Sequence, residues 1–161
     1  MVLSISPNFS YAEFDEKLNE KSMFGKSIIN IGDFDGDGIT DLAVGAYHDD
    51  DGGLNSGAIY ILFLNSDGTV KNSQEISDTK GNFGVIESNA AFGNAISNIG
   101  DLDGDGIVDL VVGSYGDSDN GYDSGAVFVI FLNIDGTVKS HQKISSIEGN
   151  FDVVLEMQLP V

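Results

Sequence analysis

The chain has 161 residues, enough for a hydrophobic core in one or two small domains, and its 41% of apolar residues argue against a disordered chain. Seven Lys and Arg residues against 26 Asp and Glu give a formal net charge of −19, which excludes nucleic acid as a partner because its binding requires clustered basic residues. The absence of cysteine excludes disulfides and thiolate metal sites, and no apolar run is long enough for membrane insertion.

An internal repeat organises the chain. Residues 24–78 align without gaps with residues 92–146, and 34 of the 55 aligned positions are identical. The first 17 residues have neither the basic region nor the apolar stretch of a signal peptide. We therefore expect four segments: an N-terminal extension (1–23), a first repeat with its linker (24–91), a second repeat (92–146) and a C-terminal tail (147–161).

Each repeat predicts four strands, which in the first copy lie at about 26–32, 41–47, 58–64 and 69–77. The segment AIYILFL at 58–64 is almost entirely apolar and should be buried on both faces, whereas TVKNSQEIS at 69–77 is polar and suits a sheet edge. The intervening Asn-Ser-Asp-Gly at 65–68 is typical of a tight turn. The other connections are too short for a crossover helix, so neighbouring strands should be antiparallel.

These elements predict an all-β chain of two four-stranded antiparallel blades that form part of a β-propeller. A sheet whose central strand is buried on both faces must be covered on both faces, and stacking sheets around an axis achieves this. A β-sandwich of eight strands is the alternative. Two near-identical copies favour the propeller, because the two sheets of a sandwich usually differ.

The segment DFDGDGITD at 33–41 and its copy DLDGDGIVD at 101–109 predict two cation sites. Carboxylates at positions 1, 3, 5 and 9 can point inward from a curling loop, and the glycines permit the curl. The peptide oxygen at position 7 would add a fifth ligand. Such flexible rings of hard oxygen ligands suit Ca²⁺ better than Mg²⁺, so we expect two Ca²⁺ ions per chain. The expected ligands are Asp33, Asp35, Asp37, Ile39 and Asp41 in the first loop and Asp101, Asp103, Asp105, Ile107 and Asp109 in the second.

Two other interpretations of these loops are weaker. An EF-hand requires a bidentate Glu at position 12 and flanking helices, but position 12 is Val44 in the first copy and Val112 in the second. A solvated acidic turn without metal is the remaining alternative, and the matched Asp and Gly residues of both copies argue against it.

The segments FG…DFDGDGITDLAVGAY and FG…DLDGDGIVDLVVGSY resemble FG-GAP repeats, the units of the integrin α-subunit-type β-propeller, which also occur in bacterial and archaeal surface proteins. The Phe-Gly pairs are Phe24-Gly25 and Phe92-Gly93, and Tyr47 and Tyr115 replace the proline of the Gly-Ala-Pro element. The resemblance implies Ca²⁺ in the same loops. It also implies a ring of seven blades, so we expect further blades from a longer chain, or self-association, to cover the outward faces of these two.

The expected function is that of a calcium-binding propeller module of an extracellular or cell-surface protein, acting in adhesion or in binding a protein or glycan ligand, and not as an enzyme. The alternative is an accessory propeller segment of a larger secreted enzyme such as a surface hydrolase. The chain has no Gly-x-Ser-x-Gly elbow, phosphate-binding loop or His-Glu-x-x-His helix. The acidic loops at 48–56 and 116–124 are interpreted as solvated connections, and His48 and His141 as surface residues.

Overall fold

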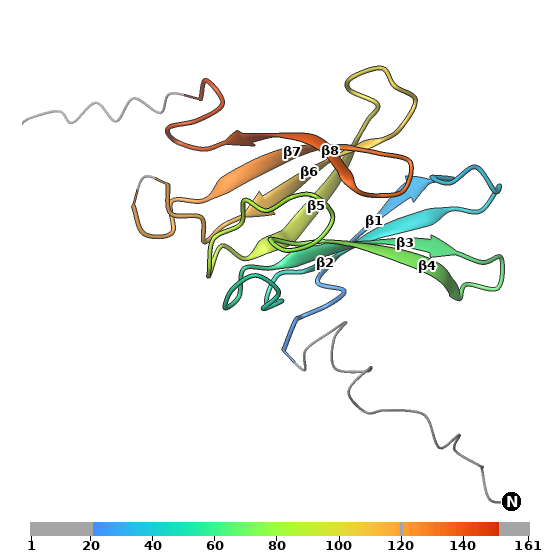
Figure 1. The fold of residues 1–161 in the computed structure, drawn as a ribbon, viewed down its shortest axis with the longest axis horizontal. Coiled ribbons are helices and arrows are strands. Elements are labelled where there is room, and N and C mark those ends of the chain that lie inside the picture. The colour runs from blue at the N-terminus through green and yellow to red at the C-terminus, as the bar shows by residue number, and fades with distance from the viewer. Residues whose placement is uncertain (1–20, 120, 152–161) are drawn as a thin grey trace, which may run out of the picture.

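The computed structural model describes residues 21–119 and 121–151, which contain eight strands in two sheets (Figure 1). Each sheet is an antiparallel meander in chain order, β1-β2-β3-β4 and β5-β6-β7-β8. The prediction of an all-β chain with two four-stranded antiparallel sheets is confirmed. The strands are β1 (Ser27–Gly32), β2 (Asp41–Ala46), β3 (Ala58–Leu64), β4 (Val70–Ile76), β5 (Phe92–Gly100), β6 (Asp109–Ser114), β7 (Ala126–Leu132) and β8 (Val138–Ile144).

Burial along the strands follows their composition. Every residue of β3 is buried or half-buried, as its apolar sequence predicts, whereas the first three residues of β4 are exposed at the sheet edge. The turn between β3 and β4 is closed by Asn65, whose N–H donates to the Thr69 carbonyl at 2.8 Å. In the described part of the chain, no helix has the length and apolar character needed to cross a membrane.

The two sheets pack through opposite faces of the repeated unit. Ile59 of β3 is fully buried in the shared core, yet its equivalent in β7, Val127, is 38% exposed. Conversely, Phe128 of β7 belongs to the shared core, whereas its equivalent Tyr60 lies in a separate cluster on the far face of the first sheet. The two copies therefore turn opposite faces of their sheets toward the shared core. Apolar positions that are buried there in one copy lie on the outer face in the other. This head-to-tail stacking is that of consecutive propeller blades.

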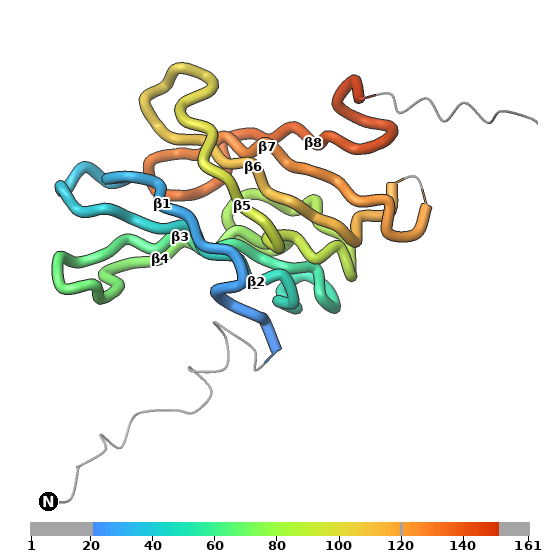
Figure 2. Tube along the Cα trace, turned by 180° about the vertical axis from the view of Figure 1, so that it is seen from behind, coloured from blue at the N-terminus to red at the C-terminus, as the bar shows by residue number. Residues whose placement is uncertain are grey.

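The start of β5 docks the second blade onto the first, where β5 lies against β1 and β2 (Figure 2). Phe92 is fully buried, and its N–H donates to the Ser56 carbonyl at 2.9 Å. A Cβ atom at Gly45 would lie 2.0 Å from the Gly93 carbonyl oxygen, and one at Gly57 would lie 2.2 Å from that of Phe92. Glycine is therefore required at both positions by the close approach of the β5 backbone.

The linker between β4 and β5 adds an aromatic side chain to the core. The Phe83 ring packs against those of Phe92 and Phe128, with centroid distances of 5.1 and 5.5 Å. The chain after β8 repeats this linker geometry, since the Ser145 N–H donates to the Glu148 carbonyl as Ser77 does to Lys80, each at 3.2 Å. The segment after β8 is therefore equivalent to the start of that linker, with Phe151 at the position of Phe83.

Candidate metal centres

Each acidic loop connects the first two strands of its sheet and curls as its glycines allow. Gly36 and Gly38 have φ angles of +80° and +88°, and Gly104 and Gly106 have +79° and +90°. Side chains with a Cβ atom rarely adopt these angles, so the two glycines of each loop direct the intervening aspartates. The loop backbone stabilises the arrangement further, because the Gly38 N–H donates to Asp33 Oδ2 at 2.9 Å.

Carboxylates converge in both loops. In the first loop, Asp33, Asp35 and Asp37 each offer an oxygen within 4.8 Å of the other two, and in the second loop Asp101, Asp103 and Asp109 do so. Asp41 and Asp105 are not members of these groups of three. The peptide oxygens of Ile39 and Ile107 stay predicted ligands. The candidate ligand atoms of both sites are all oxygens, which fits a hard divalent cation such as Ca²⁺.

The last aspartate of each loop has a second role that the sequence did not indicate. Asp41 is fully buried, and its two oxygens accept hydrogen bonds from the Phe34 and Leu64 N–H groups, both at 2.9 Å. Asp109 accepts in the same way from Leu102 at 2.8 Å and Leu132 at 3.4 Å. These carboxylates tie the loop to the end of the third strand and satisfy N–H groups that would otherwise lack partners. They are anchors of the fold, whether or not they also touch a cation.

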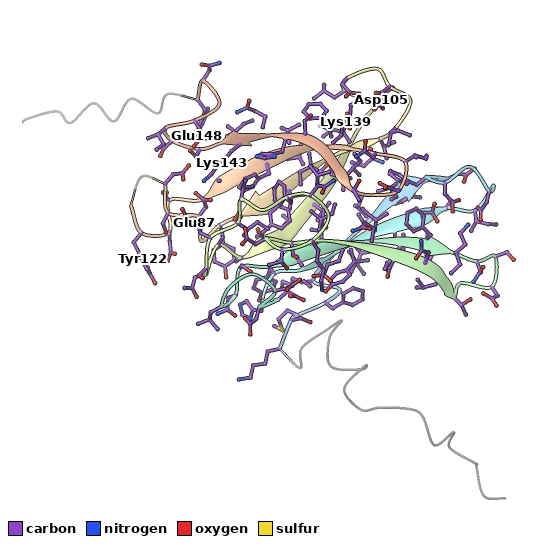
Figure 3. All side chains as sticks on the ribbon, in the orientation of Figure 1. Glu87, Asp105, Tyr122, Lys139, Lys143 and Glu148 are labelled. Carbon is purple, nitrogen blue, oxygen red and sulfur yellow. The ribbon has the colours of Figure 1, made fainter. Side chains whose placement is uncertain are left out.

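A lysine from the fourth strand of each sheet lies at each acidic loop. Lys139 Nζ lies 2.7 Å from both Asp103 Oδ2 and Asp105 Oδ2 (Figure 3). Lys71 pairs likewise with Asp35, at 2.7 Å, and with Asp37. Hydrogen bonds to the carboxylates raise the pKa of both lysines. The only sequence signal for these partners was that the same lysine stands at the same place in both repeats.

The same hydrogen bonds lower the pKa of the loop carboxyls. The bond from Lys71 is the main cause of the lowered pKa of Asp37, and the bond from Lys139 is the main cause for Asp105. Both carboxyls are therefore ionised at neutral pH. An ammonium group in this position provides positive charge where a divalent cation would lie, so cation binding must displace it.

The other pair of acidic loops is not simply solvated, so that interpretation was wrong for Asp49 and Asp117, which are 5% and 1% exposed. Asp117 pairs with Lys143 at 2.8 Å. In the first blade Glu75 replaces this lysine, and Asp49 instead accepts a hydrogen bond from the Tyr60 hydroxyl at 3.1 Å. Burial raises the pKa of Glu75 to about 7.

A family model described as FG-GAP repeat matches residues 27–62 and 92–130, which include each acidic loop and most of the first three strands of each sheet. This chain carries two FG-GAP repeats. The prediction made from the Phe-Gly pairs and the acidic loops is thereby confirmed.

Integrin α chains are among the curated relatives with similar FG-GAP segments. Integrin alpha-4 of Xenopus laevis is 36% identical over 93 residues, which cover 57% of this chain and 8% of the relative. Integrin alpha-PS2 of Drosophila melanogaster is 30% identical over 130 residues, 81% of this chain and 9% of the relative. Human integrin alpha-7 is 35% identical over 97 residues, 60% of this chain and 7% of the relative. The chain thus spans less than a tenth of the length of each of these relatives.

Proposed function

We propose that this chain is a calcium-binding β-propeller module of an extracellular or cell-surface protein, which acts in adhesion by binding a protein or glycan ligand. The likeness of its two repeats to segments of integrin α chains supports this class of function. The proposal includes a non-enzymatic role, because the loop carboxylates that acid–base chemistry would need are ion-pair partners and candidate cation ligands.

Calcium binding is proposed mainly because three carboxylates converge in each of the two acidic loops, which have the same spacing of aspartate and glycine. Ca²⁺ accepts six to eight oxygen ligands in flexible geometry, whereas Mg²⁺ demands a strict octahedron. The peptide oxygens of Ile39 and Ile107 would join the carboxylates. The competing ammonium groups belong to Lys71 and Lys139, and hydrogen bonds to the loop carboxylates raise the pKa of both. A doubly charged ion attracts the same carboxylates more strongly than a singly charged ammonium group.

Calorimetric titration with Ca²⁺ tests this part directly. We expect two ions per chain with a dissociation constant of about 0.1–1 mM, the range of extracellular calcium modules, and clearly weaker binding of Mg²⁺. The variant Asp103→Ala should bind one ion, because only its second loop is damaged. A chain that binds no Ca²⁺, or that binds Mg²⁺ equally well, would contradict the proposal.

A further inference from the structure

A cavity of about 600 Å³ opens on the outer face of the second blade. Two polar atoms of its lining residues, Asn94 Oδ1 and Ser146 Oγ, are buried and have no hydrogen-bond partner within the described residues. Buried polar atoms without a partner inside the chain are satisfied by water or by another molecule, and this open cavity admits either. We use the name socket for five of the residues that line this cavity: Gly113, Gly125, Val127, Ile144 and Phe151.

The first blade has the same socket, and there it is filled. The equivalents of the five socket residues are Gly45, Gly57, Ile59, Ile76 and Phe83, and all five are buried. The second blade fills this first socket with Phe92-Gly93, whose backbone lies against the two glycines, and with the rings of Phe92 and Phe128 around Phe83. The open socket thus has a known kind of occupant: a Phe-Gly strand start with a second aromatic ring beside it.

A matching pair of aromatic rings is already assembled on the outer face of the first blade. Phe24 and Tyr60 are the equivalents of Phe92 and Phe128, and we call this pair the plug. The plug rings lie 5.5 Å apart at 73°, almost the arrangement of Phe92 and Phe128 at 5.7 Å and 81°. Phe24 is 41% exposed, whereas Phe92 is fully buried. Tyr60 is only 5% exposed, so Phe24 presents the exposed ring of the plug.

The surroundings of plug and socket match in the same way. Ile28 and Val70, on the plug blade, are more than half exposed. On the socket blade Leu102 is also more than half exposed, and Ile99 is 38% exposed. Each of these exposed residues is the copy of one that packs into the existing contact between the blades. The pairs of exposed residue and packed equivalent are Ile28 and Ile96, Val70 and Val138, Ile99 and Ile31, and Leu102 and Phe34.

Gly113 gives an independent indication. At Gly45, its equivalent, an added Cβ atom would collide with the Gly93 carbonyl oxygen at 2.0 Å. At Gly113 the closest atom to such a Cβ is the side-chain oxygen of Asn94, at 3.0 Å, and the backbone has no positive φ. Nothing in the described structure requires glycine there. A second backbone that approached Gly113 as closely as Gly93 approaches Gly45 would require glycine at this position.

We propose that this chain associates head to tail with a second copy of itself, so that the plug of one copy enters the socket of the next. The occupant is a second copy because plug and socket are repeats of two surfaces that already fit each other within the chain. Such a contact joins two different surfaces of the partners. Successive copies therefore either close into a ring or form an open filament. Three or four copies would give six or eight blades, within the range of known propellers.

Light scattering and sedimentation velocity test this with two interface variants and one matched control. Ile28→Asp disables the plug side, and Phe151→Asp disables the socket. Both residues are more than half exposed in the single chain, so both variants should fold. Tyr122→Asp is the control, because Tyr122 is 93% exposed. Its equivalent Leu54 keeps a side chain that is 62% exposed, although the Leu54 carbonyl accepts a hydrogen bond from Asn89 at the contact with the second blade.

We expect the unaltered chain and the control to have a mass of several times 17.0 kDa, and each interface variant to have the mass of a single chain. An equimolar mixture of the two variants should form a dimer and nothing larger, because it contains one intact plug and one intact socket. A monomeric unaltered chain, a variant that dimerises alone, or a mixture that stays monomeric would overturn the proposal. The proposal does not rest on the cation, so the calcium titration and this experiment can fail separately.

Discussion

Within one acidic loop, neighbouring aspartates have different physical surroundings. Asp41 is buried and accepts two backbone hydrogen bonds, whereas Asp37 is exposed and meets Lys71. Losing the first carboxylate leaves buried backbone N–H groups without partners. Losing the second removes only exposed contacts, with Lys71 and with the Ile39 N–H, which water can replace. The two residues should therefore separate the stability of the fold from the binding of calcium.

We expect Asp41→Ala to lower the free energy of unfolding in chelator by about 1–3 kcal/mol for each N–H group left unpaired. Asp37→Ala should behave like the unaltered chain in chelator. At about ten times the dissociation constant, two calcium sites stabilise the fold by roughly 3 kcal/mol, and Asp37→Ala should lose about half of this gain. Urea unfolding with and without calcium measures both effects. Equal stability of Asp41→Ala and the unaltered chain in chelator would show that the anchor is dispensable.

Glu75 makes the stability depend on pH. Burial raises its pKa from 4.5 to about 7, so between these values the folded chain holds a proton that the unfolded chain has released. The folded state then binds more protons than the unfolded state, and stability must fall as pH rises. The stabilisation is complete below about pH 4.5 and is lost as pH passes through about 7.

We expect Glu75→Gln to flatten the decline of stability across this pH window, because glutamine cannot release a proton. Urea unfolding in chelator at several pH values between about 4.5 and 8 measures the slope. Glu87→Gln, at an exposed linker position, is the control and should keep the slope of the unaltered chain (Figure 3). An unchanged slope in Glu75→Gln would assign the pH dependence to other groups.

The packing of β5 against the first sheet requires glycine at two positions of the first repeat, Gly45 and Gly57. We expect Gly45→Ala to lower the free energy of unfolding by about 1–3 kcal/mol, the usual cost of overpacking a filled site. Gly113→Ala, at the equivalent position of the second sheet, should cost clearly less, because only the side-chain oxygen of Asn94, at 3.0 Å, has to shift. Urea unfolding should be done in the Phe151→Asp background, which keeps the chain monomeric. Equal losses for the two alanine variants would contradict the docking role of Gly45.

The strands could be predicted from the sequence, and their packing could not. In the first repeat, every strand lies within about one residue of its predicted position. The clearest signals were the apolar run of β3, the polar sequence of β4 and the turn at residues 65–68 between them. The choice of which face each sheet buries is absent from the sequence, because both repeats have nearly the same apolar pattern. That choice is made by the docking of Phe92, and by Phe83 from a linker that shows no periodicity.

The candidate site was predictable to a similar degree. The spacing of aspartate and glycine indicated where carboxylates converge, since this is a property of the local chain. The anchoring of Asp41 and the pairing of Lys71 with the loop involve residues 23 and 34 positions apart, which no local pattern reports. Tertiary packing decides such contacts.

Head-to-tail stacking of the two sheets gives the molecule two different outer faces. One end exposes Phe24 and Ile28, and the opposite end exposes Leu102 and the socket around Phe151. Two sheets packed through equivalent faces would instead have hidden or exposed the same residues in both copies. The molecule is therefore directional although its two repeats are nearly identical in sequence.

This directionality means that equal positions of the two repeats differ in mutational tolerance. In a single chain, a polar substitution should harm folding at Ile31 and spare it at Ile99, while Ile28 should be tolerant and Ile96 sensitive. Two copies that began alike would then accumulate changes on opposite sides of their sheets. A closed assembly removes the difference, because every blade then has neighbours on both faces and equivalent positions face the same constraint.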